Sequence, residues 1–227
     1  MRGNFSKLIQ AVVRGETAVV SRLLANSPEL ATLHSAGGAT RQDTSEWFFK
    51  EIAHYMYAGD TALHMAAAAF HRSAAEFLIE HGAVCRARNR RGAEPLHYAA
   101  DANHWQPAAQ KDMIDYLLAV GADPNAVDKS GVSPLHRAVR TGASEAVRAL
   151  LAGGADVRAR NRSGSTPLHL AVQDTGRSGG GSVRARGEQQ KIIAILLGAG
   201  ARATDQDSRG KSVLDASVND RIRRLLS

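Results

Sequence analysis

The residue types with the most evident chemistry in this chain are histidines and carboxylates. A carboxylate beside a histidine can exchange protons near neutral pH, because the ordinary pKa of histidine is about 6.5. The chain has nine histidines, and two of them, His54 and His104, lie close in sequence to Asp60 and Asp101. These four residues are candidate catalytic residues for acid–base chemistry, provided that the fold brings them together.

Four other histidines lie in a repeated string, which assigns them to equivalent elements. The strings are TALHMAA at 61–67, EPLHYAA at 94–100, SPLHRAV at 133–139 and TPLHLAV at 166–172, and a fifth, SVLDASV at 212–218, has Asp215 at the histidine position. Each string predicts a helix start, because Thr or Ser can cap unpaired backbone N–H groups and Pro suits the first turn.

Glycines mark the ends of the second helices. Gly82, Gly121, Gly154 and Gly200 each follow an apolar run, as glycine commonly does after a helix C-terminus. The distance from each glycine to the next motif position is always 15 residues, whereas the distance from motif histidine to glycine is 18, 24, 18 and 31 residues. The spacing predicts stacked helix pairs, with extra residues between the helices of the third and fifth units.

These strings and their spacing resemble the ankyrin repeat. The resemblance implies an all-α repeat solenoid in which stacked helix-turn-helix pairs are joined by β-hairpin fingers. It also implies that the motif histidines form structural hydrogen bonds between a helix start and a finger. The motif histidines are His64, His97, His136 and His169.

We expect a single ankyrin-repeat domain over residues 1–227, with about six units. The approximate boundaries are 1–33 for an N-terminal cap, 34–55 for an insertion in the first finger, then 56–88, 89–127, 128–160 and 161–206, and 207–227 for a C-terminal cap. The end units of a repeat array need polar outer faces, because no neighbouring unit covers them.

The insertion at 34–55 departs most from a plain array. Its apolar residues have spacings compatible with an amphipathic helix that starts after Thr44 or Ser45. They are Trp47, Phe48, Ile52, Tyr55 and Met56. In one interpretation this helix is a cover on the concave face; in the other it is a lid over a pocket, walled also by the insertions at 103–110 and 175–190. The glycine-rich run RSGGGSVRARG at 177–187 predicts a flexible loop.

The ankyrin resemblance implies that the fingers and the first helices line a groove that recognises partners, generally proteins. We therefore expect binding residues in the insertions, at the finger tips and at the ends of the first helices. They are Trp47, Tyr55, Tyr57, Asp60, Arg90, Arg91, Asp101, Trp105, Arg140, Thr141, Arg162, Gln173 and Asp174.

The charge of the chain bears on the kind of partner. The formal net charge is +7 and the pI is near 10.0. Arginines at the same positions of two fingers add a repeated basic element: Arg86, Arg88 and Arg90 match Arg158, Arg160 and Arg162. This favours an acidic protein partner, although arginines on finger edges also occur simply as a solvated face. We do not expect nucleic-acid binding, since the fingers lack interleaved aromatic residues.

Other features of the sequence limit the remaining classes. No apolar run is long enough to predict a membrane span. The single cysteine, Cys85, excludes internal disulfides and multi-cysteine metal sites. No HExxH or CxxC motif is present, so we expect neither a metal nor a cofactor. We expect a cytoplasmic monomer.

Together these features predict a protein–protein interaction module rather than an enzyme, since every motif found belongs to the scaffold. The alternative is a small-molecule-binding protein or an atypical enzyme. Its pocket would be walled by the three insertions at 34–55, 103–110 and 175–190, and it would use carboxylate–histidine acid–base chemistry.

Overall fold

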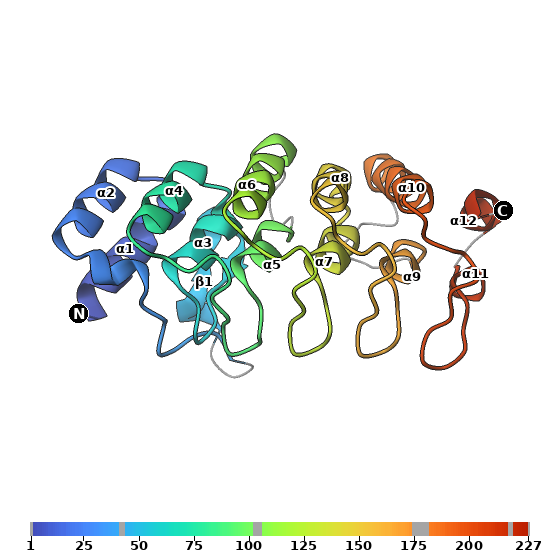
Figure 1. Cartoon of the computed structure of the whole chain (residues 1–227), viewed down its shortest axis with the longest axis horizontal. Helices are drawn as coiled ribbons and strands as arrows, with labels where there is room; N and C mark the ends of the chain where they lie inside the picture. Colours follow the sequence, from blue (N-terminus) through green and yellow to red (C-terminus); the bar gives the residue numbers. More distant parts are fainter. Residues whose placement is uncertain (1, 41–43, 102–105, 174–181, 218–219, 227) are drawn as a thin grey trace. The chain divides into compact units, whose positions relative to one another are not determined.

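The computed structural model describes residues 2–40, 44–101, 106–173, 182–217 and 220–226 (Figure 1). The chain divides into two compact units. Unit 1 comprises Met1–Ala99 and Asn103–Asp123, and unit 2 comprises Ala100–Ala102 and Pro124–Ser227. The described residues form six consecutive helix pairs, three in each unit, as the repeat spacing predicts.

Unit 1 arranges its helix pairs in two layers. The first helices are α1 (Arg2–Arg14), α3 (Ala62–Ala69) and α5 (Pro95–Ala99), and the second helices are α2 (Thr17–Asn26), α4 (Arg72–Glu80) and α6 (Pro107–Ala119). A 3-10 turn, η1 (Pro28–Ala31), follows α2. Helix α3 contacts both α1 and α5, and all of its residues are buried. Its many alanines permit this, because small side chains let neighbouring helices approach closely.

The helix expected after Thr44 or Ser45 is wrong. The segment forms a short hairpin that consists of η2 (Ser45–Trp47), β1 (Phe48–Phe49), η3 (Lys50–Ile52) and β2 (His54–Tyr55). Phe48 pairs with Tyr55, and Phe49 pairs with His54. Aromatic side chains lose rotamer freedom against the preceding turn of a helix but pack well on a pleated surface. Two aromatic pairs on either side of a tight turn therefore favour the hairpin.

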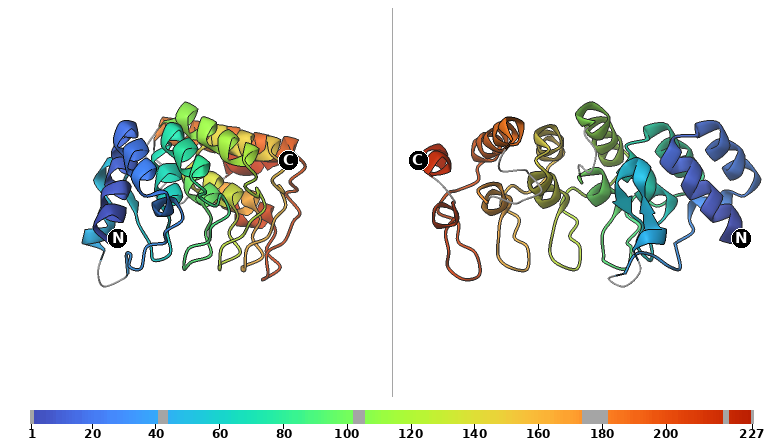
Figure 2. Two further views of the ribbon diagram at one scale, coloured as in Figure 1. Left: turned by 60° about the vertical axis from the view of Figure 1, so that its left-hand side comes forward. Right: turned by 180° about the vertical axis from the view of Figure 1, so that it is seen from behind.

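The hairpin lies beside the first helices of unit 1 and is visible from behind (Figure 2, right). Near its turn, Glu51 Oε1 lies 3.7 Å from Nε of Arg14 in α1. On β2, the ring of His54 lies 4.6 Å from the ring of Tyr98 in α5. Ile52 is buried. The hairpin therefore contacts helices that are far apart in the sequence, and its apolar turn residue is removed from water.

Unit 2 repeats the two-layer arrangement, and its described residues form one isolated antiparallel bridge, between Gln206 and Ser212, rather than a pair of strands. Its first helices are α7 (Pro134–Thr141), α9 (Pro167–Ala171) and α11 (Val213–Ala216), and its second helices are α8 (Ser144–Ala152), α10 (Val183–Gly198) and α12 (Asp220–Leu226). Its core is aliphatic and includes Leu135, Val147, Leu150, Leu168, Ile193 and Leu196. None of the helices described for this chain is both long and apolar enough to cross a membrane.

The flexible loop expected at 177–187 is wrong for its second part. The hydroxyl of Ser182 accepts a hydrogen bond from the backbone N–H of Ala185 at 3.1 Å and so caps α10, which begins at Val183. The insertion at 103–110 also ends in a helix, because α6 begins at Pro107. The predicted site residues His104, Trp105 and Asp174 lie outside the described residues.

Candidate functional site

Three of the motif histidines, His64, His136 and His169, join a helix start to the next finger. In unit 2, the backbone N–H of Ser133 donates to His136 Nδ1 at 3.3 Å, and His136 Nε2 lies 3.0 Å from the carbonyl oxygen of Ser165. A backbone N–H only donates and a carbonyl only accepts, so Nε2 carries the proton. His64 in unit 1 has the same arrangement. Burial lowers the pKa of both His64 and His136, which keeps the rings neutral.

Asp60, a predicted site residue, is the centre of a buried polar cluster in unit 1. It is fully buried. Its carboxylate accepts hydrogen bonds from the Tyr98 hydroxyl at 2.8 Å, the Asn89 side-chain amide at 2.8 Å and the backbone N–H of Tyr57 at 2.6 Å. These three donors satisfy a charge that burial would otherwise make costly. In this structure, Asp60 therefore fixes a finger against α5.

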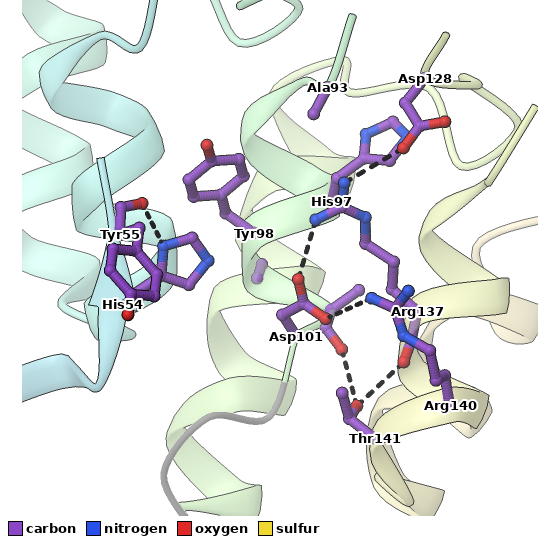
Figure 3. A network of polar contacts seen from close by, with 12 residues as sticks. His54, Tyr55, Ala93, His97, Tyr98, Asp101, Asp128, Arg137, Arg140 and Thr141 are labelled. Carbon is purple, nitrogen blue, oxygen red and sulfur yellow. Dashed lines mark hydrogen bonds and ion pairs between the residues drawn. The ribbon is translucent and has the colours of Figure 1, made fainter. Parts of the chain in front are cut away.

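His54 also contacts Tyr98, through the ring contact described above. Its Nδ1 lies 2.7 Å from the carbonyl oxygen of Tyr55, so Nδ1 carries a proton (Figure 3). The structure thus brings two of the four candidate catalytic residues, His54 and Asp60, onto the same tyrosine. Sequence reasoning did not single out Tyr98, which connects them.

Asp101, Arg140 and Thr141 belong to a network within unit 2 (Figure 3). The carboxylate of Asp101 accepts from Arg137 at 2.8 Å and from Arg140 at 3.5 Å, and Arg137 also donates to Asp128 at 3.2 Å. The Thr141 hydroxyl donates to the carbonyl oxygen of Arg137 at 3.0 Å. Three predicted binding residues therefore lie around one arginine that sequence reasoning missed.

The signal for both missed residues was their position in the repeat. Tyr98 follows the motif histidine His97, and Arg137 follows His136. Their partners in the preceding finger are also equivalent, because Asn89 donates to the Tyr98 hydroxyl at 3.0 Å and Arg137 donates to Asp128, nine residues apart in each case. A polar residue directly after the motif histidine could have identified both networks.

Among the described residues, no group of three or more His, Cys, Asp or Glu side chains could hold a metal ion. Gln173, another predicted binding residue, is partly exposed after α9, and its carbonyl oxygen accepts from Gln189 at 3.5 Å.

Most of the matched finger arginines bind groups inside their own unit. Arg86 donates to Asp123 at 3.0 Å and Arg88 donates to Glu94 at 3.0 Å. In unit 2, Arg158 donates to Asp205 at 3.0 Å and lowers the pKa of that carboxyl group. Arg160 donates to the carbonyl oxygen of Gly164 at 2.9 Å. The remaining two, Arg90 and Arg162, are exposed and form no salt bridge among the described residues.

Four side chains of unit 1 form a partly exposed row, which we call the aromatic strip: Phe48, Tyr55, Tyr57 and Arg91. The rings of Phe48 and Tyr55 are 4.8 Å apart, those of Tyr55 and Tyr57 are 6.5 Å apart, and the Arg91 guanidinium lies 4.2 Å from the centre of the Tyr57 ring. Phe48 is 36% exposed. The strip unites three predicted binding residues, whereas Trp47 packs against Gly37.

The two units differ in composition as well as in these clusters. Unit 1 contains all eleven Phe, Trp and Tyr residues of the chain, and its 12 Lys and Arg residues balance its 12 Asp and Glu residues. Unit 2 contains no Phe, Trp or Tyr, and it has 17 Lys and Arg residues against 10 Asp and Glu residues. The whole net charge of +7 therefore belongs to unit 2.

Comparisons with known proteins agree with a repeat fold. A family model described as "Ankyrin repeats (3 copies)" matches residues 8–107 and again residues 105–207. The E3 ubiquitin-protein ligase KEG of Arabidopsis thaliana is 43% identical over 81 residues, which are 36% of this chain and 5% of that protein. The target of rapamycin complex 2 subunit AVO2 of Saccharomyces cerevisiae is 23% identical over 158 residues, which are 63% of this chain and 36% of that protein. The chain thus spans a minor part of either relative.

Proposed function

Because the chain belongs to the ankyrin repeat family, whose repeats are generally protein–protein interaction modules, we propose that it binds a protein partner through its fingers and first helices. The observation that carries this proposal is the aromatic strip of unit 1. Tyrosine and arginine are enriched among residues that contribute most to interface affinity, because each combines a large contact area with hydrogen bonding. The strip presents both types side by side at a finger tip.

The strip is also ordered in a way that suits binding. Arg91 stacks over Tyr57 at 4.2 Å, and its backbone N–H donates to the Asn89 side chain at 2.9 Å. Side chains already fixed in one arrangement lose less conformational entropy when a partner binds. We therefore expect a partner to contact Tyr57, Arg91 and the exposed face of Phe48.

The test compares two matched double variants of the purified chain as baits in an extract of the source cells. One is Tyr57→Ala with Arg91→Ala, and the other is Tyr116→Ala with Arg72→Ala. The residues of the second pair lie on the second helices α4 and α6, where Arg72 stacks over Tyr116 at 5.2 Å. This control variant therefore removes the same kind of contact elsewhere in unit 1. Circular dichroism and thermal melts check that both variants fold.

We expect the strip variant to capture its specific partner at least about tenfold less than wild type, since removing interface anchors costs on the order of 2 kcal/mol. The Tyr116 variant is expected to capture it normally. Equal capture by both variants, measured by quantitative mass spectrometry, would contradict the proposal. The small-molecule or enzyme alternative, with His54, Asp60, Asp101 and His104 as its acid–base groups, stays a prediction, as do the cytoplasmic location and the monomeric state.

A further inference from the structure

The three fingers of unit 2 end in the same turn. Each turn starts at an Asp or Asn whose side-chain oxygen accepts two backbone N–H groups of the turn, two and four residues later. The starting residues are Asp128, Asn161 and Asp207. Side-chain oxygens that bind the turn in this way hold the tip in one conformation.

Adjacent tips contact each other directly. The backbone N–H of Arg162 donates to the carbonyl oxygen of Ser130 at 3.0 Å. The next tip repeats the contact, since the backbone N–H of Ser208 donates to the carbonyl oxygen of Ser163 at 3.0 Å. The finger loops of unit 2 lie on one side of its helices (Figure 1). The three tips therefore form a continuous and fixed row.

Cations occupy the outside of this row. Lys129, Arg162 and Lys211 are exposed, and none of them forms a salt bridge among the described residues. Arg209 is 80% exposed, although it lies 3.1 Å from Asp207. We call these four residues the tip cations.

The carboxylates of the same turns face the interior. The side chain of Asp128 is 11% exposed and is paired with Arg137, and the side chain of Asp207 is 4% exposed. The turn geometry thus buries the negative groups and leaves the positive groups in water. Charges at an exposed surface steer an oppositely charged partner over distances of about 8 Å at physiological ionic strength.

We infer that the tip cations of unit 2 bind an acidic, extended segment of a protein partner. This deepens the proposed function and rests on it, because it names the chemistry of one partner segment. The row is positively charged, and unit 2 contains no Phe, Trp or Tyr. Single-stranded nucleic acid binds through aromatic stacking as well as charge, so a row without aromatic residues fits an acidic peptide better.

Fluorescence anisotropy of a labelled peptide of alternating Glu and Ser residues tests the inference on the purified full chain. A Gln–Ser peptide is the uncharged control. The tip variant carries Lys129→Ala, Arg162→Ala and Lys211→Ala. The control variant carries Lys7→Ala, Arg22→Ala and Arg148→Ala, which lie exposed on helices α1, α2 and α8, so both variants lose the same charge.

The Glu–Ser peptide is expected to bind wild type with an affinity that falls as salt rises, and the Gln–Ser peptide is not expected to bind. The tip variant is expected to bind about tenfold more weakly, because it lacks three exposed positive charges of the row. The control variant is expected to stay within about twofold of wild type. Equal weakening of both variants would overturn the inference, because binding would then depend on net charge alone.

Three further outcomes are decisive. A single-stranded oligonucleotide of equal charge that binds more tightly than the peptide, through the same three residues, would overturn the assignment to a protein segment. Absence of peptide binding, together with strip-dependent capture of a partner, would overturn this inference and leave the proposed function intact. Tip-dependent peptide binding without strip-dependent capture would contradict the proposed function and leave the peptide-binding inference intact.

Discussion

Units 1 and 2 fill the same two repeat positions with different chemistry. In unit 1, Asn89 begins a finger turn and donates to Tyr98, the residue after a motif histidine. In unit 2, Asp128 begins the turn and accepts from Arg137, the residue after the next motif histidine. One position pair thus carries a neutral amide–phenol contact in one unit and an ion pair in the other, while the helix pairs around it keep the same order.

This difference separates what the repeat requires from what it permits. Both units use a buried neutral histidine and a glycine-containing finger turn, which are needed for stacking. The residue after the histidine varies: it is Met65 or Tyr98 in unit 1, and Arg137 or Leu170 in unit 2. Aromatic residues are confined to unit 1, and the net positive charge is confined to unit 2. The two proposed contact surfaces follow this division.

The largest expected effect comes from replacing the two buried carboxylates, Asp60 in unit 1 and Asp101 in unit 2. Replacing Asp60 by Ala removes one hydrogen-bond acceptor from the Tyr98 hydroxyl, from the Asn89 side-chain amide and from the backbone N–H of Tyr57, and we expect a loss of about 3 kcal/mol in the free energy of unfolding. Replacing Asp101 by Ala is expected to cost about 1 to 2 kcal/mol, because Arg137 keeps its bond to Asp128 in unit 2. Chemical denaturation measures both. Equal losses would show that the two networks stabilise their units alike.

A second prediction concerns the finger stacking that the units share. Gly164 and Gly210 have nearly the same φ, +71° and +75°, but a Cβ on Gly164 would lie 2.4 Å from the backbone nitrogen of Ser208, whereas a Cβ on Gly210 would meet nothing within 4 Å. We expect Gly210→Ala to cost about 1 to 2 kcal/mol, from the left-handed conformation alone.

Gly164→Ala is expected to cost at least about 1 kcal/mol more than Gly210→Ala, because the neighbouring finger must also move. Denaturation of the two variants gives the difference directly. If they lose the same stability, contact between adjacent fingers contributes little to unit 2.

The sequence predicted the parts of the fold that depend on strictly repeated residues. The spacing from each helix-end glycine to the next motif position is fixed, and all four marker glycines have φ between 89° and 98°. The segment at 45–55 was mispredicted because its apolar spacing fits a helix, while its aromatic residues favour a hairpin. Arg137 was missed because its partners, Asp101 and Asp128, come from separate loops that only the folded unit brings together.

A third prediction concerns the pH dependence of stability, which both units share through their buried motif histidines. Burial lowers the pKa of His64 in unit 1 and of His136 in unit 2 below the ordinary value of 6.5. As pH falls, the unfolded chain therefore takes up protons first. The free energy of unfolding is expected to be highest above about pH 6.5 and to decline below it, by at most about 0.8 kcal/mol for each histidine at about pH 6.

Denaturation midpoints across this pH range measure the decline. The variant His64→Asn with His136→Asn is the control, because Asn retains one donor and one acceptor but does not titrate there. Its decline between about pH 7 and pH 6 is expected to be smaller than that of wild type. An unchanged decline would mean that other groups cause the pH dependence.

The smallest expected effect comes from a substitution that gives one helix start of unit 1 the kind of residue found in unit 2. Glu94 stands where Ser133 and Thr166 place a hydroxyl beside a motif histidine, 2.8 and 2.9 Å from its Nδ1. Glu94 is 1% exposed, its Oε2 has no hydrogen-bond partner among the described residues, and burial raises its pKa.

A hydroxyl would cap the helix without burying a charge, so we expect Glu94→Thr to stabilise the chain by about 0.5 to 1 kcal/mol. The reverse change, Thr166→Glu, is expected to destabilise it, because Arg160, the equivalent of Arg88, donates to the carbonyl oxygen of Gly164 instead. Denaturation of both variants at neutral pH provides the measurement. A loss of stability in Glu94→Thr would show instead that the ion pairs of Glu94 with Arg86, 3.9 Å away, and with Arg88, 3.0 Å away, outweigh the cost of burying this carboxylate.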